Sequence, residues 1–121
     1  MSEKLRIAVI GIDHPHGMGW RESLKHVSDE LEMSTFVPAF NGTTTSLEER
    51  HASLPRFETV PELIRSGGDL FDGALVCLPN DQGPDAVIAL AKIGKHILLE
   101  KPGAANAADG QRITEAVRTN K

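Results

Sequence analysis

Polar residues that could do chemistry follow two short apolar runs in the second half of the chain. One run, Ala74 to Leu78, leads into Pro79-Asn80, and the other, Ile97 to Leu99, leads into Glu100-Lys101-Pro102. A lysine amine can hydrogen-bond a substrate oxygen or transfer a proton, and partial burial lowers its pKa toward the range that this role needs. On spacing alone, however, a lysine after a strand is more often an ordinary surface residue.

The elements that would position these residues can be predicted from the same stretch. Both runs are continuous and apolar, which indicates strands buried on both faces. Between them, Pro84 and Asp85 fit the start of a helix and Gly94 fits the position just past its end. Strand, helix and strand within about 30 residues form a βαβ unit with parallel strands and a right-handed crossover. Because ligands bind at the carboxyl ends of such strands, we expect Asn80 and Lys101 to lie at a ligand site.

A turn near the N-terminus is a second candidate. Leu5 to Ile10 reads as a buried strand, and Gly11-Ile-Asp-His-Pro-His-Gly17 follows it. A dinucleotide-binding turn reads Gly-x-Gly-x-x-Gly, and Asp13 stands where the second glycine lets the backbone approach the pyrophosphate. A carboxylate there repels phosphate unless it turns away or caps the helix predicted from Gly17 to Val27. The N-terminal amides of that helix could still hold a phosphate.

The two histidines of this turn, His14 and His16, allow a second interpretation. They provide only part of a metal coordination shell, and no partner cluster of Cys or His is evident in the sequence. A metal site is therefore the less favoured alternative. Contact with a bound cofactor or substrate, or a solvated turn without a role, accounts for the same pattern.

Taken together, these motifs resemble the N-terminal NAD(P)-binding domain of the Gfo/Idh/MocA family of oxidoreductases. The resemblance covers essentially the whole chain and rests on Leu78-Pro79-Asn80, Ala89-Leu90, Gly94-Lys95-His96 and Glu100-Lys101-Pro102. It implies an α/β, three-layer αβα Rossmann-like fold with five mostly parallel strands in a twisted sheet. Residues 1–121 would form one such domain, without the second, substrate-binding domain of the family.

The resemblance also assigns roles to particular residues. Lys101 would be the catalytic residue, close to the nicotinamide and the reacting carbinol of a sugar or polyol. Glu100 would orient it or bond neighbouring backbone. A histidine often stands three residues after the family's asparagine, and Gly83 takes its place here. The residues expected to contact the cofactor are Gly11, Ile12, Asp13, His14, His16, Gly17, Asn41, Leu78, Pro79, Asn80, Glu100 and Lys101.

The choice between NAD and NADP depends on the end of the second predicted strand, Leu31 to Phe40. In the family this strand usually ends on an acidic residue that binds the adenosine ribose. Asn41 stands there instead, and three threonines follow at 43–45. Asn41 could still bond the ribose, while the missing carboxylate removes repulsion toward a 2′-phosphate. This leaves the cofactor open, slightly favours NADP, and leaves the alternative that the loop has no cofactor role.

The remaining segments are predicted as scaffold. Capping boxes begin two helices, and a last helix ends the chain with a predicted buried apolar stripe. The segments are a helix from Ser46 to about Leu54, a brief strand or extended link at Pro55 to Glu58, and a helix from Thr59 to Gly68. The last helix runs from Asn106 to about Thr119, is capped by Asn106 or Asp109, and is expected to bury Ile113, Ala116 and Val117.

Composition limits the classes of function. The net charge of −4 argues against a general nucleic-acid or anionic-membrane binder, and no apolar run approaches the roughly 20 residues of a membrane span. The single cysteine, Cys77, predicts an inert core thiol in a reducing cytoplasm. With the strand order 3-2-1-4-5-6 that is usual for this fold, His96 to Leu99 would be an exposed edge strand, which predicts a homodimer or an edge shielded by rearranged termini. The rival interpretation is a non-catalytic nucleotide-sensing or protein-interaction module.

Overall fold

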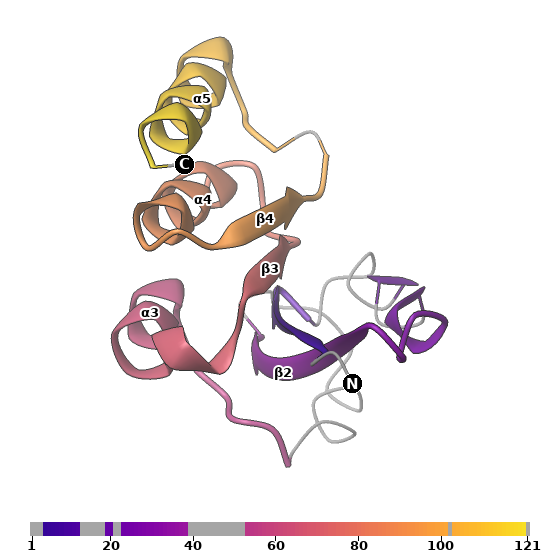
Figure 1. Cartoon of the computed structure of the whole chain (residues 1–121). Helices are drawn as coiled ribbons and strands as arrows, with labels where there is room; N and C mark the ends of the chain where they lie inside the picture. The colour runs from indigo at the N-terminus through magenta and orange to yellow at the C-terminus, as the bar shows by residue number, and fades with distance from the viewer. Residues whose placement is uncertain (1–3, 13–18, 21–22, 39–52, 102, 121) are drawn as a thin grey trace.

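A parallel sheet forms the centre of the molecule (Figure 1). The computed structural model describes residues 4–12, 19–20, 23–38, 53–101 and 103–120. Within them the sheet has four strands in the order β2-β1-β3-β4, all paired in parallel. Their bounds are Leu5–Ile10 for β1, Leu31–Val37 for β2, Gly73–Val76 for β3 and His96–Leu99 for β4. This arrangement confirms the predicted α/β, Rossmann-like fold.

The expectation of five strands is wrong for the described residues. The link at Pro55 to Glu58 forms a single parallel bridge, between Arg56 and Phe36 of β2, on the side of β2 that faces away from β1. Around this bridge, Phe36 N donates to Pro55 O at 3.3 Å and Phe57 N donates to Phe36 O at 3.1 Å. Pro55 has no N–H to extend the ladder, which limits this row to one bridge.

Helices cover the two faces of the sheet unequally. Helix α3 (Val60–Gly67) and helix α4 (Gly83–Lys92) lie against one face, and a short 3₁₀ turn, η1 (Gly68–Leu70), follows α3. The larger core cluster lies on this face and consists of Ala8, Ile10, Val37, Leu63, Phe71, Ala74, Val76, Ala86 and Leu90. The opposite face carries a smaller cluster of Val9, Ile12, Phe36 and Leu75, against which Trp20 and Leu24 pack. Residues 19–20 and 23–25 are helical, as predicted for this part of the chain.

Two predictions about burial are corrected by this arrangement. Helix α5 (Ala107–Thr119) packs on α4 rather than on the sheet, as Figure 1 shows. None of its residues, all of which the structure describes, is buried, so the predicted stripe of Ile113, Ala116 and Val117 is at most half-buried. Arg112 of α5 joins the two helices through an ion pair of 2.9 Å with Asp85.

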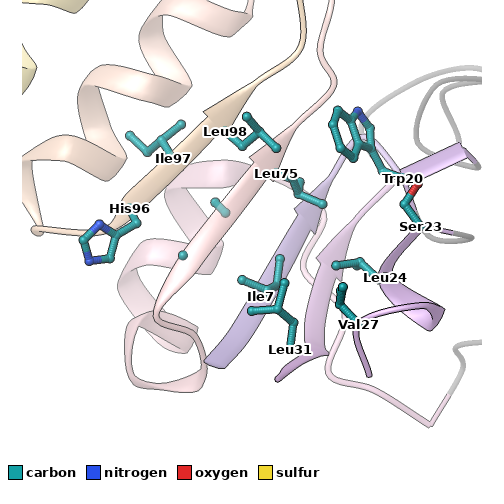
Figure 2. Close-up of a pocket in the computed structure, with 12 residues that line it drawn as sticks. Ile7, Trp20, Ser23, Leu24, Val27, Leu31, Leu75, His96, Ile97 and Leu98 are labelled. Carbon is teal, nitrogen blue, oxygen red and sulfur yellow. The ribbon is translucent and has the colours of Figure 1, made fainter. Parts of the chain in front are cut away.

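The prediction that both apolar runs are buried on both faces holds only for β3. That strand is buried throughout, although it ends at Val76, two residues before the predicted Leu78. In β4, burial alternates: Ile97 and Leu99 are half-buried on the α4 side, whereas His96 and Leu98 are exposed. On the opposite face, Trp20 and Leu24 of the helical segment pack against the smaller core cluster, and Leu98 of β4 stays half exposed. An apolar groove of about 390 Å³ is left on this face (Figure 2), lined by Ile7, Trp20, Ser23, Leu24, Val27, Leu31, Gly73, Ala74, Leu75, His96, Ile97 and Leu98.

Local signals at the helix ends are largely confirmed. The Thr59 side chain accepts a hydrogen bond from Glu62 N at 3.2 Å at the start of α3. Asn106, rather than Asp109, caps α5, because its Oδ1 accepts from Asp109 N at 2.9 Å. The helix predicted from Ser46 lies almost entirely outside the described residues. In the described part of the chain, no helix combines the length and the apolar character needed to cross a membrane.

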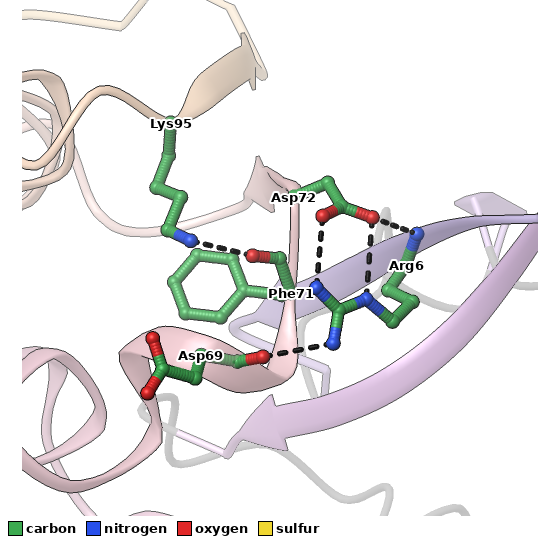
Figure 3. Close-up of polar contacts among 5 residues, drawn as sticks. All are labelled: Arg6, Asp69, Phe71, Asp72 and Lys95. Atoms are coloured by element: carbon green, nitrogen blue, oxygen red, sulfur yellow. Dashed lines mark hydrogen bonds and ion pairs between the residues drawn. The ribbon is translucent and has the colours of Figure 1, made fainter.

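A polar cluster fastens the amino ends of the strands (Figure 3). Asp72 accepts hydrogen bonds from the backbone N of Arg6 at 2.8 Å and from its guanidinium at 2.9 and 3.3 Å. These bonds lower the pKa of Asp72 from 3.8 to about 2. Lys95 Nζ donates to Phe71 O at 2.6 Å and lies 4.6 Å from the Phe71 ring centroid. The cluster therefore holds β1, β3 and the segment before β4 together at the edge opposite their carboxyl ends.

Candidate functional site

The chain leaves β1 through a glycine that its surroundings require. Gly11 has a φ of +85°, and a Cβ atom there would lie 2.3 Å from the carbonyl oxygen of Cys77. Its N–H donates to Val37 O at 2.7 Å, and the N–H of Ile12 donates to the same oxygen at 3.3 Å. The first turn residues therefore lie between the ends of β2 and β3, where only glycine fits without strain.

Ile12 can contribute to a binding site only through its backbone. Its side chain is fully buried in the smaller core cluster. Because the N–H groups of Gly11 and Ile12 both donate to Val37, amide donors for a phosphate have to come from later residues of the turn. Of the predicted contacts in this region, Asp13, His14, His16 and Gly17 lie outside the described residues, as do Asn41 and Pro102.

The end of β3 turns the chain directly into α4. Cys77 N donates to Ile10 O at 2.9 Å, which keeps the chain beside β1 for one residue past the strand. Pro79 O then accepts from the N–H groups of Gln82 and Gly83, each at 2.9 Å. Leu78 and Pro79 are half-buried and Asn80 is exposed. Asn80 is therefore available to a ligand at this edge of the sheet.

The Cys77 thiol lies at the same strand end but is unreactive. Its side chain is buried. Burial raises the pKa of this thiol from 9.0 to about 11, and the nearby Glu100 carboxylate adds to the increase. The thiol is therefore protonated at neutral pH, in agreement with the predicted inert core thiol.

The end of β4 carries Glu100 and Lys101. Glu100 N donates to Val76 O at 2.9 Å, which extends the pairing with β3 by one residue. The Glu100 side chain accepts from Lys101 N at 3.2 Å on Oε1 and from Trp20 Nε1 at 2.7 Å on Oε2. The first bond confirms that Glu100 bonds neighbouring backbone. The Lys101 side chain is exposed.

Two contacts of this site were not found from the sequence. One is the Trp20–Glu100 hydrogen bond, which has no local sequence signal. The other is the close approach of Gly83 and Gly103: a Cβ on Gly83 would lie 3.2 Å from Gly103 O, and Gly103 has a φ of +84°. The turn after Lys101 thus passes over the first residue of α4, which accounts for glycine at position 83. The Pro102-Gly103 pair was the available signal for such a turn.

The topology brings most of the described candidates to one edge of the sheet. Gly11, Asn80 and Lys101 follow β1, β3 and β4, and these strands are neighbours. Among the described residues, no group of three His, Cys, Asp or Glu side chains could hold a metal ion. The metal site proposed at His14 and His16 lies outside the described part of the chain. The described candidates at this edge therefore offer backbone groups, the Asn80 amide, the Glu100 carboxylate and the Lys101 amine.

Comparisons with known proteins agree with this geometry. The sequence model of the Gfo/Idh/MocA oxidoreductase family, described as an NAD-binding Rossmann fold, matches residues 5–121. The myo-inositol 2-dehydrogenase of Thermotoga maritima is 29% identical over 114 residues, which are 94% of this chain and 33% of that protein. The chain thus spans about a third of the length of this relative.

Solved structures give the same result for the fold. A probable dehydrogenase from Thermotoga maritima superposes with a TM-score of 0.80 at 29% identity, over 96% of this chain and 34% of that one. The WlbA dehydrogenase from Bordetella pertussis, solved with NADH and UDP-GlcNAcA, superposes with a TM-score of 0.85 over 98% of this chain and 35% of that one. At 19% identity this second match speaks to the fold alone. With the family model matched from residue 5 to the last residue, the chain belongs to the Gfo/Idh/MocA oxidoreductase family and forms its NAD-binding Rossmann domain.

Proposed function

We propose that this domain binds a nicotinamide dinucleotide and presents Lys101 for hydride transfer to or from a carbinol of a sugar or polyol. The observation that carries the proposal is the convergence of Gly11, Asn80 and Lys101 at the carboxyl ends of three neighbouring strands. Parallel sheets bind dinucleotides at this edge. The substrate class is supported by the 29% identical relative, a myo-inositol 2-dehydrogenase.

In this proposal each residue has a limited task. The nicotinamide ring supplies or accepts the hydride when it is bound. Gly11 keeps the turn close to the ends of β2 and β3, so that no side chain stands between the strands and the dinucleotide. The Lys101 amine hydrogen-bonds the substrate oxygen and carries the proton that accompanies the hydride. Glu100 holds the backbone from which Lys101 projects, through the 3.2 Å bond to Lys101 N.

Three finer parts of the proposal rest mainly on sequence. The preference for NADP over NAD depends on Asn41, which lies outside the described residues. A cytoplasmic location is supported by the single, buried thiol of Cys77. For the 121-residue chain by itself we expect dinucleotide binding without turnover, because it corresponds to about a third of the related dehydrogenase.

The proposal is tested by titrating the chain separately with NADH and NADPH. Trp20 is the only tryptophan and the chain has no tyrosine, so protein emission reports on one site. Trp20 bonds Glu100, the neighbour of Lys101. Energy transfer from Trp20 to the reduced nicotinamide should therefore be efficient and saturable, and it should be reversed by excess oxidised dinucleotide.

Each result of this titration has a definite meaning. The ligand with the lower Kd identifies the preferred cofactor. Lys101→Ala should still bind, because most of the dinucleotide contacts lie elsewhere along the three strand ends. The absence of saturable transfer with both ligands at millimolar concentration would reject the proposal and favour the non-catalytic interaction module.

We also propose that the chain forms a homodimer through β4. His96 N donates to Asp72 O, just before β3, and Glu100 N donates to Val76 O of β3. The alternation along a strand therefore directs the backbone groups of Ile97 and Leu99 to the other edge of β4, where the described residues form no further strand. Leu98, on the groove side of the same strand, is 50% exposed. An unpaired, apolar edge of this kind is a template for a second strand.

Light scattering after size exclusion tests the dimer. We expect a concentration-dependent dimer for the natural sequence and a monomer for Leu98→Lys, because a charge on an edge strand opposes pairing. Val117→Lys is the matched control: Val117 is 49% exposed, but it lies on α5, and this variant should remain dimeric. A monomer at all concentrations of the natural chain contradicts the proposal.

A further inference from the structure

Trp20 and Glu100 connect two parts of the candidate site that are 80 residues apart in the sequence. Trp20 belongs to the helical segment that follows the glycine turn, whereas Glu100 ends β4. The indole Nε1 donates to Glu100 Oε2 at 2.7 Å, a short distance of the kind found when a carboxylate accepts the bond. The residues that hold this indole ring are the apolar ones of the smaller core cluster.

The second oxygen of the same carboxylate also accepts a hydrogen bond. Glu100 Oε1 accepts from Lys101 N at 3.2 Å, and Glu100 N is itself fixed to Val76 O at 2.9 Å. The Glu100 side chain therefore bonds Trp20 and the backbone of Lys101, and the Glu100 backbone N–H bonds β3. A carboxylate with a donor on each oxygen has few alternative rotamers, and these bonds connect Trp20 with the backbone of Lys101.

We propose that Trp20 is a positioning residue for Lys101 and acts through the Glu100 carboxylate. The bond would also make the two ends of the dinucleotide site depend on each other, because Trp20 follows the turn after β1 and Lys101 follows β4. The dependence of cofactor binding on this connection rests on the proposed function. The Trp20–Glu100–Lys101 connection itself does not.

The connection is tested by NMR on the ligand-free chain. A single indole N–H resonance is expected, since there is one tryptophan, and it should exchange slowly with water. Glu100→Gln should move this resonance together with the Lys101 amide. Trp20→Phe should also move the Lys101 amide. Glu100→Ala removes the acceptor of the indole bond altogether, so the double variant with Trp20→Phe should move the Lys101 amide no further than Glu100→Ala alone.

Ser23→Ala is the matched control in the same helical segment. Ser23 Oγ donates to Gly19 O at 3.1 Å and has no bond to Glu100, so this variant should leave the Lys101 amide in place. The inference is overturned if Trp20→Phe leaves the Lys101 amide unmoved, or if Ser23→Ala moves it as far. If Glu100→Gln does not fold, the natural chain, Trp20→Phe and Ser23→Ala still decide between these outcomes.

Calorimetric titration with NADH then tests the consequence for the site. Loss of the hydrogen bond to the carboxylate should weaken NADH binding roughly tenfold in Trp20→Phe. Glu100→Gln keeps an acceptor but loses the charge that strengthens the bond, so it should weaken binding by less, and Ser23→Ala should bind as the natural chain does. Unchanged NADH affinity in both variants would overturn the role in cofactor binding. Failure of the natural chain to bind NADH would instead reject the proposed function. The shifts of the Lys101 amide resonance would still show whether Trp20, Glu100 and Lys101 are connected.

Discussion

Replacing Gly11 with alanine is expected to lower the free energy of unfolding by at least about 3 kcal/mol and to abolish dinucleotide binding. Two effects add. The φ of +85° is unfavourable for any residue with a Cβ, and that Cβ would lie 2.3 Å from Cys77 O, a backbone atom that cannot move without disturbing β3. Urea unfolding followed by circular dichroism measures the stability, and energy transfer to NADH measures the binding.

The chain offers two matched controls that separate the two effects. Gly94 has a similar φ of +75° with no atom near its missing Cβ, so Gly94→Ala should cost only about 1–2 kcal/mol. Gly110 lies within α5 and also has open space around it, so Gly110→Ala should stabilise the chain by about 0.5–1 kcal/mol. If Gly11→Ala is no less stable than Gly94→Ala, the contact with Cys77 does not require glycine.

Those parts of the fold that depend on local pattern could be predicted from the sequence. The bounds of β1, the helix start at Pro84 and the cap at Asn106 follow from residue type and spacing, and the structure agrees with them. The arrival of Asn80 and Lys101 at one edge follows from the parallel βαβ unit alone. These predictions needed no knowledge of what packs against each element.

The predictions that the structure contradicts concern features that depend on tertiary contacts. The run Ile97 to Leu99 is as apolar as a doubly buried strand, but its burial is decided by which faces of β4 are covered. Among the helices that the structure describes, α4 covers one face, and the other face is left exposed at His96 and Leu98. The stripe on α5 failed for a similar reason, since that helix packs on α4. The Trp20–Glu100 bond and the contact of Gly83 with Gly103 O join residues distant in sequence, and periodicity carries no information about such pairs.

The second large effect is expected at the amino ends of the strands. Phe71 is fully buried in the larger core cluster, and Lys95 lies over its ring. Truncation to alanine should cost about 3–5 kcal/mol, a large part of the roughly 5–15 kcal/mol that stabilises a domain. Phe71→Leu, which keeps most of the volume, should cost about 1 kcal/mol. Urea unfolding at neutral pH measures both variants.

The same variants test whether the core and the candidate site are separable. Phe71 lies just before β3, at the edge opposite Gly11, Asn80 and Lys101, so its truncation should leave the affinity of the folded chain for NADH unchanged. NADH in excess stabilises the folded state by an amount set only by its concentration and Kd. The gain on adding NADH should therefore be equal in Phe71→Ala and in the natural chain, although their starting stabilities differ. A smaller gain in unfolding free energy in Phe71→Ala would show that packing at the amino ends of the strands affects NADH binding at the opposite edge. Gly11→Ala should show no such gain, because its binding site is lost.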